Sequence, residues 1–415
     1  MASLRRNFTL MVAGRVVYAL SQWLLLILLA RLSSAELLGH FTYALAVTGP
    51  IIVFSQLNMR AYMATDAANR YGFSDYLLTR FFTLTIALAA IGAIVLATGL
   101  QGIAATLLIL VGLYKAIEAL SDLFYGVMQK RERMAPIARS VSTRGLLALL
   151  AMSLALTTGN GIVLGTLGIT LGWLGVLLFH DLPSARRLLE PSQPEGTPHP
   201  AARPHIWSLG LTCLPMGFVV TLMSLRINIP TYFIRHLLGS EAVGHYSAVA
   251  YFLVAGALVS GSLAQASSPR LARLLHEGRR SEFLGLLYKL LGLSSLVGLT
   301  GVLAASLLGG EILRLVYGEG YEQLQGLLVV IMLAAAINYL AQLIGMSLTV
   351  ARLLWFQLLA NGLATLVVTV LAYLLVPSQG LIGGGIALLS GIASALACNA
   401  AALVLVLRKI LPTPA

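Results

Sequence analysis

Three charged residues, Lys115, Glu118 and Asp122, interrupt the long apolar segment 103–127. Spacings of three and four place them on one face of a helix. Glu118 or Asp122 is a candidate to exchange a proton or a sodium ion, and Lys115 a candidate to contact a phosphate. The same pattern also fits a ladder of ion pairs in which the three side chains neutralise one another. Their role would then be only to lower the cost of a polar helix face in an apolar segment.

Two arginines lie in apolar segments, Arg15 in the first and Arg226 near the middle of the seventh. An ionised side chain at the centre of a bilayer costs about 2.5–3.5 kcal/mol on insertion scales, so such residues face water or a partner. A guanidinium presents a planar fork of donors that suits phosphate oxygens, and it keeps its charge. We expect the two arginines to contact an anionic ligand, or else to pack between helices with carbonyl or acidic partners. Other polar residues in or near apolar segments fit sugar contacts or interhelical hydrogen bonds: Gln22, Gln56, Asn58, Gln265, Asn338 and Gln342.

The composition indicates which structural elements carry these charged residues. Of the 415 residues, 58% are hydrophobic and 10% charged, and the mean hydropathy is +0.89, whereas soluble domains carry roughly 25% charged residues. A bilayer core about 30 Å thick needs roughly 20 apolar residues per helix. The sequence therefore predicts an all-α integral membrane protein with about twelve transmembrane helices, near 8–31, 38–58, 77–99, 103–127, 138–158, 161–180, 212–235, 243–266, 283–308, 323–347, 353–376 and 381–407.

The basic residues give the orientation. With a cytoplasmic N-terminus, all but six of the 27 fall at the inner ends of the segments; Arg31, Arg235 and Arg314 fall outside, and the other three lie within segments. This asymmetry follows the positive-inside rule. This asymmetry explains the net charge of +12, so binding to nucleic acid is not needed to explain it. It also predicts cytoplasmic N- and C-termini.

A loop is repeated in the two halves of the chain. "SSAELLGHF" (33–41) and "GSEAVGHY" (239–246) align with an offset of 205 residues. Glycine in each copy permits a tight helix entry, and the glutamate suits a helix N-terminus. We interpret the loop as a structural turn kept from a duplicated ancestor, rather than a substrate contact.

The repeat predicts two parallel six-helix bundles around a central cavity, as in alternating-access transporters. A polar, proline-rich stretch halfway along the chain reads as a cytoplasmic linker. We expect an N-terminal bundle over 1–180, the linker over 181–205 and a C-terminal bundle over 206–415. The seventh segment is overlong, so we expect 206–211 to be an interfacial lead-in and Pro230 to be a kink.

Enzyme motifs are missing from the sequence. It has no nucleophile elbow, no phosphate-binding loop and no zinc motif, and its two cysteines, Cys213 and Cys398, lie apart in apolar segments. We therefore expect no catalytic residues, no cofactor and no metal site.

Several motifs resemble those of bacterial polysaccharide transporters. They are "LLARLSSAELLGHFTYALAV", "LRINIPTYFIRHLLGSEAVGHYSAVAYF", "SSPRLARLLHEGRRSEF", "LRLVYGEGYEQL" and "GLIGGGIA", in the family's order. These are the Wzx-type O-antigen flippases of the multidrug/oligosaccharidyl-lipid/polysaccharide exporter (MOP) superfamily. The resemblance implies export of oligosaccharide linked to undecaprenyl diphosphate across a bacterial inner membrane, with a polysaccharide polymerase and a chain-length regulator as partners. Where such sequences often carry an acidic residue after "R-I", this chain has Asn228, which argues against a coupling carboxylate there.

Together these features predict a lipid-linked oligosaccharide flippase for O-antigen or a related surface polysaccharide. Arg226, Arg15, Lys115 and Asn228 are the expected substrate contacts, and Glu118 and Asp122 the candidates for coupling to H⁺ or Na⁺. The alternative is a drug, small-molecule or cation antiporter of the same superfamily. A non-transporting membrane scaffold would give no reason to bury Arg226.

Overall fold

The computed structural model describes residues 2–66, 70–158, 161–189, 206–351 and 353–410, and its regular elements are all helices. Ten helices in these ranges are long and apolar enough to cross a membrane. Two of them have 49 and 51 residues, which at 1.5 Å per residue is enough for two crossings each. They break at Gly239 (φ 89°) and Gly380 (φ 58°). The prediction of an all-α membrane protein with about twelve spans is confirmed.

The helices form two compact units. The first comprises the chain up to Ser33 together with His40–Ser224, and the second comprises Ser34–Gly39 together with the chain from Leu225 onward. The predicted linker lies mostly outside the described residues, at 190–205, and its first part is helical. The bundle boundaries 1–180 and 206–415, and a cavity between the bundles, stay predictions.

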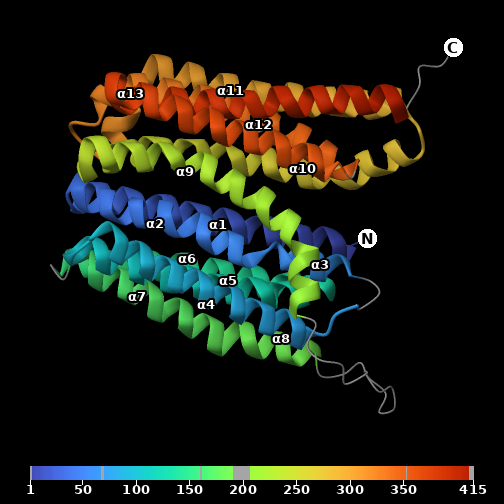
Figure 1. Ribbon diagram of the computed structural model, residues 1–415, viewed down its shortest axis with the longest axis horizontal. Coiled ribbons are helices and arrows are strands. Elements are labelled where there is room, and N and C mark those ends of the chain that lie inside the picture. Colours follow the sequence, from blue (N-terminus) through green and yellow to red (C-terminus); the bar gives the residue numbers. More distant parts are fainter. Residues whose placement is uncertain (1, 67–69, 159–160, 190–205, 352, 411–415) are drawn as a thin grey trace. The chain divides into compact units, whose positions relative to one another are not determined.

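In the first unit, α5 (Gly102–Lys130) is the central helix, with α3 (Met59–Thr65), α4 (Phe73–Thr98) and α7 (Gly161–Val176) packed against it. Next to these, α1 (Ala2–Leu32) packs on α6 (Met134–Thr157), which also packs on α7. Figure 1 shows α1, α4, α5, α6 and α7 as long rods running side by side. The unit also contains α2 (Ala35–Gln56) from His40 onward, the π-helical turn η1 (Leu177–Asp181), α8 (Leu182–Leu189) and the start of α9 (Ile206–Ala250).

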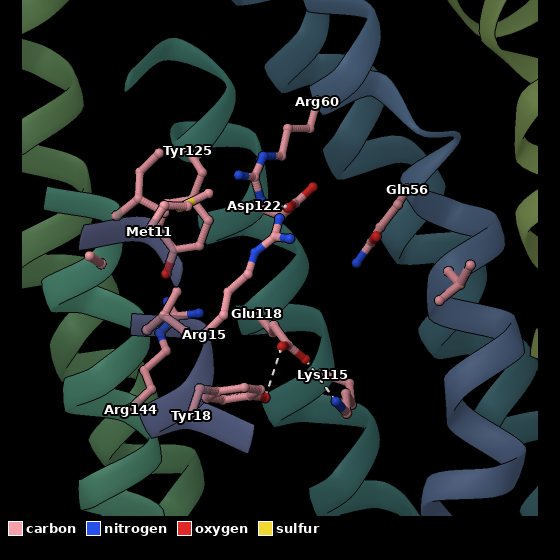
Figure 2. Close-up of a pocket in the computed structure, with 14 residues that line it drawn as sticks. Met11, Arg15, Tyr18, Gln56, Arg60, Lys115, Glu118, Asp122, Tyr125 and Arg144 are labelled. Atoms are coloured by element: carbon pink, nitrogen blue, oxygen red, sulfur yellow. Dashed lines mark hydrogen bonds and ion pairs between the residues drawn. The ribbon is translucent and has the colours of Figure 1, made fainter. Parts of the chain in front are cut away.

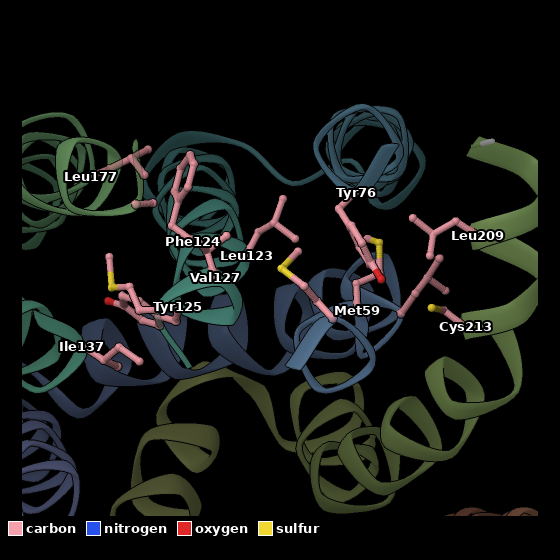
Figure 3. Close-up of a cluster of buried hydrophobic side chains, with 14 residues drawn as sticks. Met59, Tyr76, Leu123, Phe124, Tyr125, Val127, Ile137, Leu177, Leu209 and Cys213 are labelled. Carbon is pink, nitrogen blue, oxygen red and sulfur yellow. The ribbon is translucent and has the colours of Figure 1, made fainter. Parts of the chain in front are cut away.

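A strained break separates α2 from α3. Leu57 (φ 47°) and Asn58 (φ 51°) both have left-handed backbone dihedrals, which cost non-glycine residues about 1–3 kcal/mol each. Leu57 is buried, and Gly217 of α9 lies against it. Figure 3 shows part of the apolar cluster around this break, which includes residues from α3, α4, α5 and α9: Met59, Tyr76, Leu123, Leu209 and Cys213.

In the second unit, α12 (Gln325–Val350) is the central helix. It packs on α10 (Phe252–His276), α11 (Arg280–Tyr317) and α13 (Leu354–Ile410), and a 3₁₀ turn η2 (Glu322–Leu324) precedes it. The Tyr317 hydroxyl donates to the Ala248 carbonyl at 2.8 Å and so ties α11 to the end of α9. Large leucines remain exposed on the outer helices, for example Leu307 and Leu363, as expected of surfaces that face lipid.

The two copies of the repeated loop contact each other within the second unit. A Cβ at Gly39 would overlap the carbonyl oxygen of Ser240, and a Cβ at Gly244 would overlap that of Ala35. The offset of 205 relates Ala35 to Ser240 and Gly39 to Gly244, so the contact is reciprocal, as in a two-fold interface. Both glycines have ordinary helical surroundings and are absent from the positive-φ residues. Their small size is needed for helix contact and not, as the sequence predicted, for a tight turn.

The structure adds detail to the seventh segment. Residues 206–211 are helical and belong to α9, and the residue with non-helical dihedrals in α9 is Gly239. An interfacial position for 206–211 and a kink at Pro230 stay predictions. A proline ring can be accommodated inside a membrane helix when neighbouring groups satisfy the freed carbonyl, whereas a glycine with positive φ ends the helical path outright.

Replacing Gly39 by Ala is expected to lower the thermal stability of the purified protein, because the new methyl group meets backbone that cannot move aside. Overpacking of this kind costs about 1–3 kcal/mol. Gly49→Ala in the same helix is the matched control, since the nearest atom to its Cβ would be the Ser224 Oγ at 3.9 Å. The control should match or exceed wild-type stability, because Ala favours helix over Gly; equal melting temperatures for the two variants would contradict the close contact.

Candidate functional site

A cavity of about 410 Å³ lies inside the first unit, between α1, α2, α3, α5 and α6. Helical periodicity explains its lining: α1 contributes residues at i, i+4 and i+7, and α5 contributes residues at i, i+3, i+7 and i+10. Figure 2 shows the polar members gathered around one space. The lining residues are Met11, Arg15, Tyr18, Val53, Gln56, Arg60, Lys115, Glu118, Asp122, Tyr125, Ile137, Ala138, Val141 and Arg144.

Glu118 and Lys115 form an ion pair at one side of this pocket. The Lys115 Nζ lies 2.8 Å from Glu118 Oε2, and the Tyr18 hydroxyl donates to the other carboxylate oxygen at 3.1 Å. Both dashed contacts are visible in Figure 2. The ammonium group also lies 6.0 Å from the centroid of the Trp173 ring, within the range of a cation–π interaction. Glu118 is therefore held on both oxygens while it stays 29% exposed.

Asp122 is paired with a residue outside its own helix. The Arg60 Nη1 lies 2.9 Å from Asp122 Oδ1, and the Arg60 Nε donates to Gln129 Oε1 at 3.0 Å. Arg15 extends toward Asp122 in Figure 2, and the Asp122 charge acts on it. The expected ladder within one helix is thus only half right: Lys115 pairs with Glu118, and Asp122 pairs across the pocket with Arg60.

Arg144 holds one wall of the pocket in place through a buried ion pair. Its Nη2 donates to Asp181 Oδ2 at 2.8 Å and to the Ser121 hydroxyl, and the two side chains of the ion pair are 2% and 0% exposed. His180 Nδ1 lies 3.1 Å from the second Asp181 oxygen. Asp181 is the last residue of the π-helical turn η1, which follows α7. The pair fixes α6 to η1 at the level of the pocket.

The pocket carries more positive than negative charge. Four cations line it, Arg15, Arg60, Lys115 and Arg144, against two carboxylates, Glu118 and Asp122. Even with Asp181 counted as the partner of Arg144, one cation remains in excess. A partly buried pocket of this kind favours an anionic ligand, because charge-assisted hydrogen bonds strengthen where water is scarce.

The structure divides the predicted substrate contacts between the two units. Arg15 and Lys115 line the pocket of the first unit, whereas Arg226 and Asn228 lie on α9 in the second unit. Arg226 is 3% exposed, and its Nη1 donates to Asn361 Oδ1 at 3.2 Å. The Asn361 amide in turn donates to the Gln357 carbonyl at 2.8 Å. Arg226 therefore packs between α9 and α13 with a neutral amide partner, while Asn228 is half-buried.

Sequence reasoning missed Arg60 and Arg144, which were attributed to the positive-inside pattern. The sequence does contain a signal for Arg144, since it follows Ile137 by seven and Val141 by three residues and so shares their helix face. Arg60 has no such signal, because the break at Leu57–Asn58 changes the direction of the helix before it. No group of three or more His, Cys, Asp or Glu residues suited to a metal ion occurs in the part of the chain that the structure describes.

A search against protein-family models finds no match. Among curated proteins, the chain is 25% identical over 328 residues to the capsular polysaccharide biosynthesis protein CapF of Staphylococcus aureus, covering 79% of this chain and 80% of CapF.

Solved structures give the fold. A multidrug resistance MATE family transporter of the MOP superfamily, in an inward-facing conformation, matches with a TM-score of 0.76 at 14% identity over 98% of this chain and all of the transporter. The lipid II flippase MurJ in an inward closed conformation matches with a TM-score of 0.70 at 14% identity, covering 95% and 87% of the two chains. A MOP superfamily transporter from Pyrococcus furiosus matches with a TM-score of 0.67 at 15% identity, covering 99% and 96%. The fold that the resemblance implied is thereby confirmed.

The buried pair predicts that Asp181→Asn destabilises the protein strongly, because it leaves Arg144 charged and without its counter-ion. Breaking such a pair costs about 3–5 kcal/mol. The matched control is Glu311→Gln, which breaks the exposed Arg314–Glu311 pair of 2.8 Å in α11 and should cost at most about 1 kcal/mol. Thermal unfolding in detergent measures both. Similar small shifts for the two variants would show that Arg144 does not depend on Asp181.

Proposed function

We propose that this chain, which has the fold of the MOP superfamily and a relative in capsular polysaccharide biosynthesis, is a lipid-linked oligosaccharide flippase. It moves undecaprenyl-diphosphate-linked units of O-antigen or a related surface polysaccharide from the cytoplasmic to the periplasmic leaflet of a bacterial inner membrane, by alternating access. Both termini are cytoplasmic in this proposal, and the chain carries out transport without catalysis.

The excess of cations in the pocket is the observation that supports the proposal most. A diphosphate has closely spaced anionic oxygens, and Arg15, Arg60 and Lys115 point donors into one space. Two guanidinium groups can each bind two oxygens, and the lysine adds a mobile point charge. The head group would then bind in the pocket while the prenyl chain stays in lipid.

Arg226 and Asn228 would act at a later position of the head group. Both lie in the second unit, outside the pocket, and the Arg226 charge has a neutral amide as its partner. An arginine bonded to an amide remains able to attract an anion, because the amide leaves its charge uncompensated. We therefore propose that the second unit receives the diphosphate after the first.

The membrane potential would supply part of the drive. Moving one negative charge outward across an inside-negative membrane gains about 2.3 kcal/mol per 100 mV. Of the two candidate coupling carboxylates, Glu118 suits proton or sodium exchange better than Asp122. Its partners are an amine and a hydroxyl, whereas Asp122 is held by a guanidinium that does not lose its charge.

A drug, small-molecule or cation antiporter of the same superfamily is the second candidate. The match to MATE transporters supports it at the level of fold, and the two pocket carboxylates are the feature that a cationic substrate would use. Both carboxylates are already paired with basic side chains, at 2.8 and 2.9 Å. Either kind of ligand would have to break these pairs, but the excess of cations in the lining repels a cation and attracts an anion, so the pocket favours the flippase. A polysaccharide polymerase and a chain-length regulator are the expected partners of such a flippase.

Replacing Arg15 and Lys115 by Gln, singly, is expected to weaken binding and flipping of a fluorescent prenyl-diphosphate-linked sugar in proteoliposomes. Each charge-assisted hydrogen bond contributes about 1.5–3 kcal/mol, so each change should cost about tenfold or more in affinity. Arg139→Gln, an exposed residue of α6 outside the pocket, serves as the control and should flip normally. Undiminished flipping by both pocket variants, or transport of organic cations in place of the lipid, would favour the antiporter.

Glu118→Gln tests ion coupling separately from substrate binding. The neutral side chain cannot take up a proton or bind sodium, so flipping should stop responding to an imposed pH or sodium gradient but still accelerate under an inside-negative potential. Proteoliposomes with defined gradients measure both responses. If wild type and variant respond equally to the gradients, Glu118 only neutralises Lys115.

A further inference from the structure

Arg80 of α4 is a buried charge that the pocket does not explain. Its side chain is 0% exposed, and none of its three nitrogen atoms has a hydrogen-bond partner among the described residues. A guanidinium does not lose its proton under physiological conditions, so Arg80 cannot escape the cost of burial by becoming neutral. A buried ion without a partner is strongly unfavourable. The residue therefore needs a partner in another conformation.

Asp122 is the carboxylate best placed to be that partner. Arg80 lies on the buried face of α4, one turn after Tyr76, and α4 packs against α5, which carries Asp122. Asp122 is the carboxylate whose charge reaches Arg80. Figure 3 shows Tyr76 and Cys213 in the same apolar cluster.

Asp122 is engaged elsewhere in the described conformation, and its present partner sits on a strained segment. Arg60 binds Asp122 from α3, directly after Leu57 and Asn58 with their left-handed dihedrals. A return of these two residues to right-handed helical dihedrals would continue α2 into α3 and turn Arg60 away from its present direction. The Arg60–Asp122 pair is thus the contact most easily exchanged.

We infer that Asp122 is passed between two arginines during transport: it pairs with Arg60 when the pocket is empty and with Arg80 when an anionic head group binds Arg60. The inference rests on the proposed function. In the loaded state the phosphate replaces Asp122 on Arg60, and Asp122 neutralises Arg80, so all the charges are paired. With an empty pocket, releasing Asp122 leaves Arg60 without a counter-ion, which opposes cycling without substrate. Arg80 is then a positioning residue that never touches the substrate.

Arg80→Met separates this role from an ordinary structural one. The variant removes the unpaired buried charge, so the melting temperature of the empty protein should rise by a few degrees. Binding of a prenyl-diphosphate probe should be retained, and flipping in proteoliposomes should fall about tenfold or more. Arg139→Met, which removes one exposed basic residue of α6, controls for altered membrane insertion and should change none of the three measurements.

A double-mutant cycle, measured by melting temperature, tests the exchange without any substrate. Arg60→Met alone should lower the melting temperature only slightly, because Asp122 then pairs with Arg80. Adding Arg80→Met should lower it far more, although that change alone raises it, so the two effects should be clearly non-additive.

The exchange is overturned if Arg80→Met lowers stability or does not fold, or if the two changes add. Either result would mean that Arg80 has a fixed structural role, with its guanidinium donors satisfied by water or backbone carbonyls. The proposed function fails by a different result: wild-type protein that neither binds nor flips the diphosphate probe, whatever the double-mutant cycle gives.

Discussion

The cost of placing a charge in a medium of low dielectric governs the arrangement of this protein. Each ionised group in the apolar interior must find a partner, water or a ligand. Lys115 pairs with Glu118 of its own helix. Asp122 and Arg144 pair with residues of other elements, and these two pairs fasten the helices that enclose the pocket. Cations outnumber carboxylates in the lining of the pocket, so the pocket favours an anion.

Glycine contacts and strained turns set the framework around these charges. Reciprocal approach at Gly39 and Gly244 brings the two copies of the repeated loop together, and breaks at Gly239 and Gly380 separate consecutive spans. The left-handed pair before α3 instead stores strain beside the pocket, where it carries Arg60. The rigid contacts thus lie at the repeated loops, whereas the deformable backbone lies beside Arg60, whose ion pair we propose to change during transport.

Much of the fold could be predicted because hydrophobic segments and the repeat are long-range, redundant signals. The α5 residues of the pocket were also predictable, because the spacing of Lys115, Glu118 and Asp122 fixes a common helix face. Arg60 and Asp181 were not, since each follows a local departure from α-helix that a periodic pattern does not reveal. Arg80 was counted only as an inner-side basic residue, because burial without a partner is a property of packing.

The central claim is that the pocket of the first unit binds an anionic head group. A structure of the protein with a prenyl diphosphate, determined in a lipid nanodisc, tests it most directly. The account predicts density for the diphosphate within hydrogen-bond distance of Arg15, Arg60 and Lys115, with the Arg60–Asp122 pair broken. Diphosphate density outside this pocket, with the pair of 2.9 Å intact, would contradict it.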